Sequence, residues 1–398
     1  MKTACKLIEH PKIAIDLAIV IGNTVAKFSL KHHESDFLPY VKNWILKCKS
    51  DFARLCLITG CLNHGLITKT LLEFSFGLVL KSCQLQSNHA YQSFQCLKLW
   101  SMKAKSFQEM SVYFKQDKVL IQELLDLINS NWENPLRGVS DLLVDTMTNV
   151  LAILKDPSLD KQLLEKTLSN LNWKMKAKYP PLMVLLPRVG VENVLNEYPD
   201  FGEGLTQSLS SNHLASAGAS CYRTIIKTKA IFSSWKTHLM KPFLECLCHD
   251  PRSLVRNNAK NHWLNPTLTF LPKEAAESML ELLDESDECS VVRFLIIKGQ
   301  RLNGQVEQLD ESYLHLVSQG LNHSNPDVCL AAFSVIAHVK KKGSVPSSQE
   351  LQLCIDFLVN HLTVDDPSFR QSLISDFTQL MIRCRDTSVS LFKKKDER

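Results

Sequence analysis

Residues 366–384 read DPSFRQSLISDFTQLMIRC, and this stretch carries the pattern that decides the fold. It opens on Asp366-Pro367, a dipeptide that ends one helix and begins the next, because proline fits the first helical turn and disfavours helix at the residue before it. Apolar side chains then follow at steps of four, three, one and three residues, at Leu373, Phe377, Leu380, Met381 and Cys384. That spacing places them on one helical face. We therefore predict a helix that begins near Pro367 and buries Leu373, Phe377 and Leu380.

Similar turns recur along the chain at a nearly regular interval. Asp250-Pro251, Asn325-Pro326 and Asp366-Pro367 bracket the related turn Ser286-Asp287-Glu288. Pro251 and Pro326 are 75 residues apart, which corresponds to two periods of about 37, and Pro367 follows after another 41. A period near 40 that contains two helices is typical of HEAT or armadillo repeats. The predicted fold is an all-α, HEAT/armadillo-like α-solenoid of stacked antiparallel helix pairs.

A helix pair of this kind cannot bury its own apolar face, so neighbouring pairs must stack into one core. We therefore predict a single continuous α-solenoid over residues 1–398, with helices over 1–114, HEAT-like repeats over 115–392 and a charged tail over 393–398. Helices should begin close to Pro251, Pro326 and Pro367. Residues 202–220 are rich in Ser, Gly and Ala, which predicts a long loop between helices.

Composition excludes several classes of protein. The chain has 398 residues, with 13 Gly, 15 Pro, 45% hydrophobic and 22% charged residues. Few chain-breaking residues and many apolar ones argue against an all-β protein and against disorder, and no apolar run is long enough to span a bilayer. The 13 cysteines are scattered through apolar helical stretches, which is not the pattern of a disulfide framework and favours a reducing compartment. Such a compartment is the cytosol or the nucleus, and we expect a cytoplasmic protein.

The sequence contains few signs of catalytic chemistry. The sequence has no P-loop, no G-x-G-x-x-G, no H-E-x-x-H and no G-x-S-x-G motif. We therefore expect neither an enzyme nor a bound cofactor. The nearest approach to a metal site is the run Cys246, Cys248, His249 and Asp250, which has no second ligand pair at zinc-finger spacing. Two cysteines at the end of an apolar helix are typical of core packing, and we favour that interpretation.

Basic residues are better organised. The net charge of +5 permits a phosphate-bearing partner without requiring one. Two ridges at helical spacing and one segment that interleaves cations with aromatic rings give the candidate RNA-binding residues: Trp173, Lys174, Lys176, Lys178, Tyr179, Arg223, Lys227, Arg252, Arg256 and Lys260. Cations on such ridges contact phosphates, and aromatic rings stack on unpaired bases. The alternative is that arginines at a fixed repeat position, such as Arg256 and Arg293, bond to a neighbouring repeat, and that the lysines form a solvated face.

Two longer segments point to a family. Residues 131–139 read NWENPLRGV and lead through NWKMKAKY at 172–179 to GVENVL at 190–195, and DPSFRQSL at 366–373 continues to IRCRDTS at 382–388. These segments resemble the thyroid adenoma-associated protein (THADA) family, and the resemblance extends over most of residues 115–395. It is faint over the first hundred residues. It implies an armadillo-like, non-catalytic partner of an FtsJ-type methyltransferase subunit that 2′-O-methylates a ribose in the tRNA anticodon loop.

One family motif, Arg-Arg-Ser-Ala-Gly-Leu-Pro, is missing from this sequence. The chain resembles a segment upstream of the central domain that carries this motif, so we expect a fragment or a truncated relative of a larger protein. Two functions stay open. The first is an accessory subunit for tRNA methylation, with tRNA as a possible ligand, and the second is a HEAT-type scaffold that binds proteins and has no RNA role.

Overall fold

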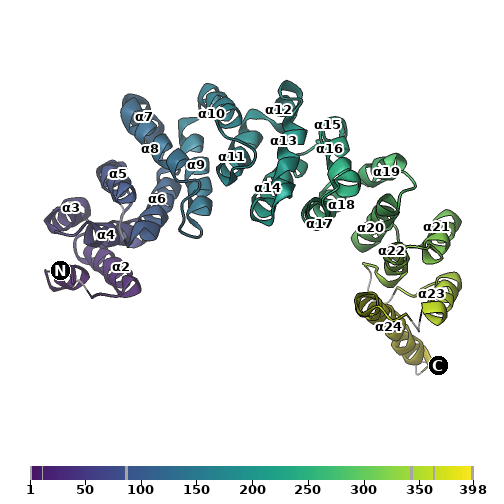
Figure 1. Cartoon of the computed structure of the whole chain (residues 1–398). Coiled ribbons are helices and arrows are strands. Elements are labelled where there is room, and N and C mark those ends of the chain that lie inside the picture. Colours follow the sequence, from purple (N-terminus) through teal and green to yellow (C-terminus); the bar gives the residue numbers. More distant parts are fainter. Residues whose placement is uncertain (1, 11, 86–87, 341–343, 362–363, 396–398) are drawn as a thin grey trace. The chain divides into compact units, whose positions relative to one another are not determined.

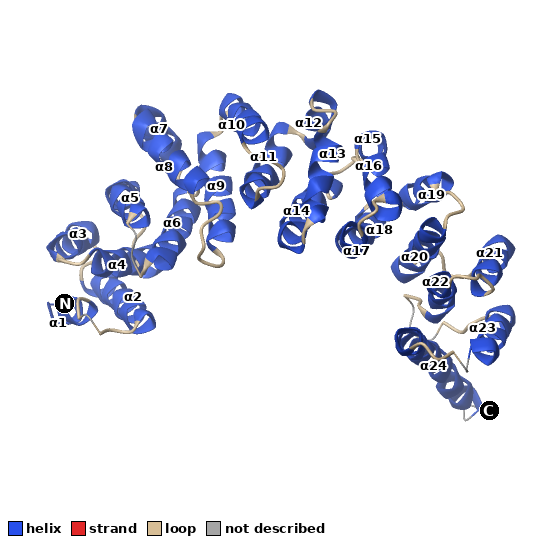
Figure 2. Cartoon of the chain, in the orientation of Figure 1, coloured by secondary structure: helices blue, strands red, loops and turns tan. Residues whose placement is uncertain are grey.

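The computed structural model describes residues 2–10, 12–85, 88–340, 344–361 and 364–395. These residues form helices joined by turns, with no strand among them (Figure 2). The chain divides into two units, residues 1–189 and residues 190–398. The prediction of an all-α solenoid of helix pairs is confirmed within each unit, whereas one continuous solenoid over the whole chain stays a prediction.

Unit 1 stacks its helices in two layers (Figure 1). The first layer holds α2 (Ile15–His32), α4 (Asp51–His64), α6 (Ala90–Ala104), α9 (Val139–Leu154) and α11 (Tyr179–Val189). The second layer holds α3 (Phe37–Lys47), α5 (Lys69–Gln84), α7 (Glu109–Gln116), α8 (Lys118–Ser130) and α10 (Pro157–Asn170), and the short α1 (Lys2–Ile8) packs against α2 and α4. Successive helices of the first layer contact one another, so each buries apolar surface against its neighbours, as a solenoid requires.

Glycines allow α2 and α4 of unit 1 to approach each other closely. A Cβ atom on Gly60 of α4 would lie 2.2 Å from the backbone oxygen of Gly22 in α2. A Cβ atom on Gly22 would lie 2.3 Å from the backbone oxygen of Cys56. Because protein interiors are already close-packed, any side chain at either glycine would push the two backbones apart.

Unit 2 repeats the two-layer arrangement (Figure 1). Its first layer holds α14 (Asn212–Ile226), α17 (Ser253–Ala259) continued by the π-helix η4 (Lys260–Leu264) and α18 (Asn265–Phe270), then α20 (Asp287–Asn303), α22 (Pro326–Ala337) and α24 (Pro367–Lys395). Its second layer holds α12 (Val191–Glu197), α13 (Phe201–Thr206), α15 (Phe232–His238), α16 (Met240–Leu244) continued by the π-helix η3 (Glu245–His249), then α19 (Lys273–Leu282), α21 (Glu311–Leu321) and α23 (Ser348–His361). None of the described helices in either unit combines the length and apolar character that crossing a membrane requires.

The proline turns begin helices where the sequence predicts. α22 begins at Pro326 and α24 at Pro367, while α17 begins two residues after Pro251. The residue before each of the first two prolines also caps the new helix: Asn325 Oδ1 accepts from the backbone N–H of Asp327 at 2.9 Å, and Asp366 Oδ1 accepts from the backbone N–H of Ser368 at 2.7 Å. Side-chain capping and the fixed φ of proline therefore act together at these turns.

The loop predicted over residues 202–220 is wrong. This stretch forms most of α13, the 3-10 turn η2 (Gln207–Ser210) and the first part of α14. Gly202 is buried, and a Cβ atom at this position would lie 2.2 Å from the backbone oxygen of His238. The small residues that suggest a loop therefore serve close packing between helices.

The predicted burial of α24 is confirmed for Leu373 and Leu380, which are 8% and 4% exposed, and is wrong for Phe377, which is 38% exposed. Successive residues of a helix are about 100° apart. Phe369, Leu380 and Leu373 therefore lie within about 40° of one another, whereas Phe377 lies about 40° further round, beyond Leu373. α24 contacts α22 through the narrower stripe. Of the predicted charged tail, residues 396–398 lie outside the described residues.

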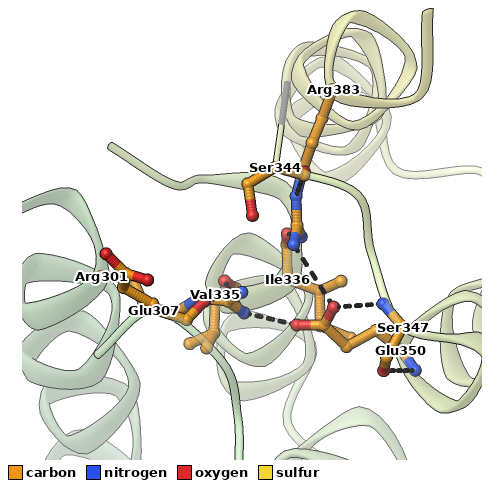
Figure 3. Close-up of polar contacts among 8 residues, drawn as sticks. All are labelled: Arg301, Glu307, Val335, Ile336, Ser344, Ser347, Glu350 and Arg383. Carbon is orange, nitrogen blue, oxygen red and sulfur yellow. Dashed lines mark hydrogen bonds and ion pairs between the residues drawn. The ribbon is translucent and has the colours of Figure 1, made fainter. Parts of the chain in front are cut away.

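A buried ionic triad joins α20, α23 and α24 (Figure 3). Glu350 Oε1 accepts a hydrogen bond from Arg301 Nη1 at 2.8 Å, and its Oε2 lies 3.3 Å from Arg383 Nη2. Arg301, Glu350 and Arg383 are 1%, 3% and 5% exposed. Further guanidinium N–H groups donate to the backbone oxygens of Val335, Ile336 and Ser344. The triad therefore links the last turn of α20, the first turn of α23 and the middle of α24 through charged groups in place of apolar contacts.

Candidate nucleic-acid interface

The aromatic and basic segment around Trp173 lies between α10 and α11. Lys178 is 1% exposed, and its Nζ donates to the backbone oxygens of Leu168 at 2.8 Å and Leu171 at 2.6 Å. The same Nζ lies 4.4 Å from the centre of the Trp173 ring. A cation at this place satisfies carbonyl groups that the end of α10 leaves without helical partners. Desolvation lowers the pKa of Lys178 to about 8.

Tyr179 is fully buried, and its hydroxyl donates to the backbone oxygen of Trp173. Lys178 and Tyr179 therefore have a packing role in this structure in place of the expected contact with RNA, because neither has a free surface for a phosphate or a base. Lys174 is exposed, while Trp173 and Lys176 are half-buried. The surface that this segment offers is reduced to these three side chains.

The first predicted ridge, Arg223 and Lys227, lies at the C-terminal end of α14. Arg223 and Lys227 are both exposed, one helical turn apart. Lys227 Nζ lies 4.8 Å from the centre of the Phe270 ring, so the lysine has an aromatic neighbour in α18. A cation over an aromatic face stays available to a phosphate, because the ring does not neutralise its charge. This ridge keeps the geometry that a phosphate contact needs.

The second predicted ridge, on α17 and η4, is largely paired with acidic groups. Arg256 Nη2 lies 3.0 Å from Glu288 Oε1 and Lys260 Nζ 3.8 Å from Glu288 Oε2, so both cations reach across to α20. Arg256 also donates to the backbone oxygen of Asp250 at 2.7 Å. Arg252 is 60% exposed by its side chain and forms an ion pair with Asp250 at 2.8 Å, and this hydrogen-bonded guanidinium lowers the pKa of Asp250. The inter-repeat alternative thus describes Arg256 and Lys260, and Arg252 stays at the surface.

Arg293, one repeat later, differs from the inter-repeat prediction, because its hydrogen bonds lie within its own repeat. Its Nη2 donates to the backbone oxygens of Leu283 and Asp284, both at 3.2 Å, in the turn before its own helix. Arg256 likewise bonds to the turn that precedes α17. An arginine at this position of the repeat therefore holds the turn that starts the first-layer helix.

Acidic side chains collect beside Lys260, a feature that the sequence motifs did not indicate. A hollow of about 300 Å³ is lined by carboxylates from three first-layer helices, together with Lys260 and Lys298: Asp287, Glu288, Asp327 and Asp376. Asp287 and Asp327 each lie in the first turn of a helix, one repeat apart. This spacing was the available signal. Carboxylates repel phosphates, so this hollow disfavours a phosphate contact beside Lys260.

The run Cys246, Cys248, His249 and Asp250 does not form one cluster. The Cys246 thiol is hydrogen-bonded to Thr206, and Asp250 is occupied by Arg252. Cys248 and His249 instead face two residues that no sequence motif connects with them, Asp284 and Cys289. The consecutive placement of Cys248 and His249 comes from the π-helix η3, on which both lie.

Comparisons with known proteins show which family and which solved structures this chain resembles. Residues 232–398 match a family model described as Trm732, TPR repeats. A Gallus gallus protein named tRNA (32-2′-O)-methyltransferase regulator THADA is 23% identical over 370 residues, which cover 82% of this chain and 19% of the relative. Proteins of the same name from Mus musculus and Homo sapiens are 22% and 21% identical, covering 70% and 69% of this chain. The resemblance to the THADA family is confirmed.

The THADA-like chain is short beside these relatives, since it spans 16–19% of their length. Among solved structures, it is similar to Kap121p bound to Nup53p, with a TM-score of 0.55 at 11% identity, over 95% of this chain and 41% of that one. It is also similar to Kap95p in a structure with RanGDP, with a TM-score of 0.55 at 13% identity, over 100% of this chain and 53% of that one. At such identities the likeness shows the solenoid fold alone.

Proposed function

We propose that this chain is a helical segment of a non-catalytic regulator that supports 2′-O-ribose methylation of the tRNA anticodon loop by a partner FtsJ-type methyltransferase. The observation that carries the proposal is the match to THADA regulators over most of the chain. The family match over residues 232–398 and the absence of catalytic motifs from the sequence support it. A solenoid suits this role because each repeat adds surface for a partner while contacting only its neighbours.

Reconstitution tests the proposal. The purified chain, the FtsJ-type methyltransferase of the same organism and unmodified tRNA are combined, and methylation of the anticodon-loop ribose is measured by mass spectrometry. We expect the chain to co-purify with the enzyme and to raise the methylation rate, and we expect no methylation by the chain alone. A chain that neither binds the enzyme nor changes the rate would contradict the proposal.

Within this function, we propose that Arg223 and Lys227 are tRNA contacts of unit 2, and that the exposed Arg252, which precedes α17, is a further one. Removing one cation that binds a phosphate lowers the slope of log affinity against log salt by roughly 0.7–0.9, because fewer counterions are then released on binding. Replacing Arg223 and Lys227 by Gln should therefore lower the slope by about 1.4–1.8. The matched control replaces Lys241 and Lys273, two exposed lysines of the second layer, and should leave the slope unchanged.

A protein scaffold with no RNA role is the second candidate function. The observation that favours it is the pairing of Arg256 and Lys260 with Glu288, together with the acidic hollow beside them. Under this alternative, the Arg223 and Lys227 variant binds tRNA with the same salt slope as the unmodified chain, while binding of the methyltransferase persists. Removing Arg256 then lowers the thermal stability without any effect on RNA affinity.

A further inference from the structure

Four side chains with metal-ligating groups meet where η3 contacts the start of α20. Cys248 and His249 come from η3, Asp284 from the turn after α19, and Cys289 from the first turns of α20. The ligand atoms of His249, Asp284 and Cys289 all lie within 4.8 Å of one another. The Cys248 thiol lies outside this group of three, and it interacts with the Cys289 thiol beside it. One thiol, one imidazole and one carboxylate therefore converge from segments about one repeat apart, and a second thiol lies next to Cys289.

The separations are close to those of a tetrahedral zinc site. Zn–S bonds near 2.3 Å and Zn–N or Zn–O bonds near 2.0–2.2 Å place neighbouring ligand atoms about 3.4–3.8 Å apart. In this structure, Cys289 Sγ lies 3.9 Å from His249 Nε2, and His249 Nε2 lies 4.0 Å from Asp284 Oδ2. Side-chain rotations that move these atoms by a few tenths of an ångström would bring them to the zinc spacing, and a rotation of Cys248 would bring its thiol in as the fourth ligand.

The burial of the ligand side chains and the hydrogen bonds that orient them fit a metal that joins two repeats. Cys248 and Cys289 are 4% and 0% exposed, whereas the side chains of His249 and Asp284 are 42% and 57% exposed. The thiols thus form the inner wall, and the metal has an entry path from solvent past the imidazole and the carboxylate. The carboxylate is oriented by the backbone N–H of Ser286, which donates to Asp284 Oδ1 at 2.9 Å. Such outer contacts are a regular feature of metal ligands.

The donor set also selects the kind of metal. Two thiolates and one carboxylate carry three negative charges, and the imidazole is neutral. A divalent ion neutralises two of these charges and leaves a net charge of −1. The Lys260 ammonium acts electrostatically on Cys248. Thiolate and imidazole donors suit zinc and exclude magnesium and calcium, which take oxygen ligands. We propose that His249, Asp284 and Cys289 bind zinc, with Cys248 turning in as the fourth ligand, in a structural site that joins the end of η3 to the start of α20. The proposal is independent of the proposed function.

Metal analysis of the full chain tests this site. Protein expressed in zinc-supplemented medium and purified without chelator should contain about one zinc per chain by mass spectrometry of the metal. After exchange into Co²⁺, the spectrum should show the thiolate-to-cobalt charge-transfer band and the visible bands of a tetrahedral site. Chelation should lower the melting temperature. Zinc far below one per chain, with no thiolate band on adding Co²⁺, would overturn the proposal, and so would a disulfide between Cys248 and Cys289 in protein purified under reducing conditions.

Variants separate the ligands from their surroundings. Cys248→Ser should weaken Co²⁺ binding at least tenfold and remove part of the charge-transfer intensity. Cys246→Ser is the matched control, because Cys246 lies two residues away and contacts Thr206 instead, and it should keep the metal. His249→Gln and Asp284→Asn change exposed side chains, so they keep the fold even where loss of a buried thiol does not. Unchanged Co²⁺ affinity in both of these surface variants would also overturn the proposal.

Discussion

Replacing Glu350 by Gln should remove the charge that holds two buried guanidinium groups together while keeping the size of the side chain. Glu350 lies 2.8 Å from Arg301 and 3.3 Å from Arg383. At an effective dielectric constant of about 20, these contacts correspond to gross attractions of about 6 and 5 kcal/mol. Desolvation of the three ions offsets most of this attraction. Without Glu350, the two guanidinium groups keep their backbone partners and repel each other.

Breaking a buried ion pair by removing one partner costs about 3–5 kcal/mol. We therefore expect Glu350→Gln to lower the free energy of unfolding by about 4 kcal/mol. Urea unfolding followed by circular dichroism measures the loss, and hydrogen exchange should locate it in α20, α23 and α24. The matched control is Asp365→Asn, which removes an ion pair with Arg370 at the surface, where Asp365 is 98% exposed by its side chain. This control should cost under about 0.5 kcal/mol.

A second comparison shows whether the charges or their packing matter. Replacing the whole triad by Met at Arg301, Leu at Glu350 and Met at Arg383 removes all three desolvation penalties at once. We expect this triple variant to be about as stable as the unmodified chain or more stable. A loss under about 1 kcal/mol for Glu350→Gln, or a triple variant as unstable as the single one, would refute the reasoning.

Three further predictions concern packing and pH. Gly60→Ala should destabilise unit 1 by about 1–3 kcal/mol, because its methyl group overlaps the backbone of α2. Gly77→Ala in α5, where a Cβ meets nothing within 4 Å, should stabilise unit 1 by about 0.5–1 kcal/mol. Urea unfolding measures both changes. Leu373→Ala should cost about 2–5 kcal/mol and Phe377→Ala clearly less, and equal losses would place the buried stripe of α24 differently. Because desolvation lowers the pKa of Lys178 from 10.5 to about 8, its charged form destabilises the folded chain below pH 8, and this penalty disappears as the pH rises to 10.5. The stability of the unmodified chain relative to Lys178→Met should therefore rise between pH 8 and pH 10.5.

Much of the architecture follows from local patterns in the sequence. Helix starts at Pro326 and Pro367 could be predicted because proline and a capping residue act on their own backbone, without regard to the rest of the fold. The buried stripe of α24 was only partly predictable. Helical spacing gives a face, and the exposure of Phe377 depends on how wide a strip the neighbouring helix covers.

The candidate site was likewise only partly predictable from the sequence. The sequence identified which residues are cationic, and it could not tell which cations are free, because that depends on groups one repeat away. Glu288 pairs with Arg256 and Lys260, and the end of α10 binds Lys178. Arg223 and Lys227 stay exposed on α14.

The sequence by itself determined the helical solenoid, its repeat near 40 residues and the resemblance to THADA regulators, because periodicity, turn chemistry and short motifs are written within a few residues of one another. The tertiary structure alone decided the buried Arg301–Glu350–Arg383 triad and the meeting of Cys248 and His249 with Asp284 and Cys289. These contacts join neighbouring repeats, and no pattern within one repeat records which side chain of the next will face it. Stacking supplies that information, since it brings residues about one period apart to within a few ångströms.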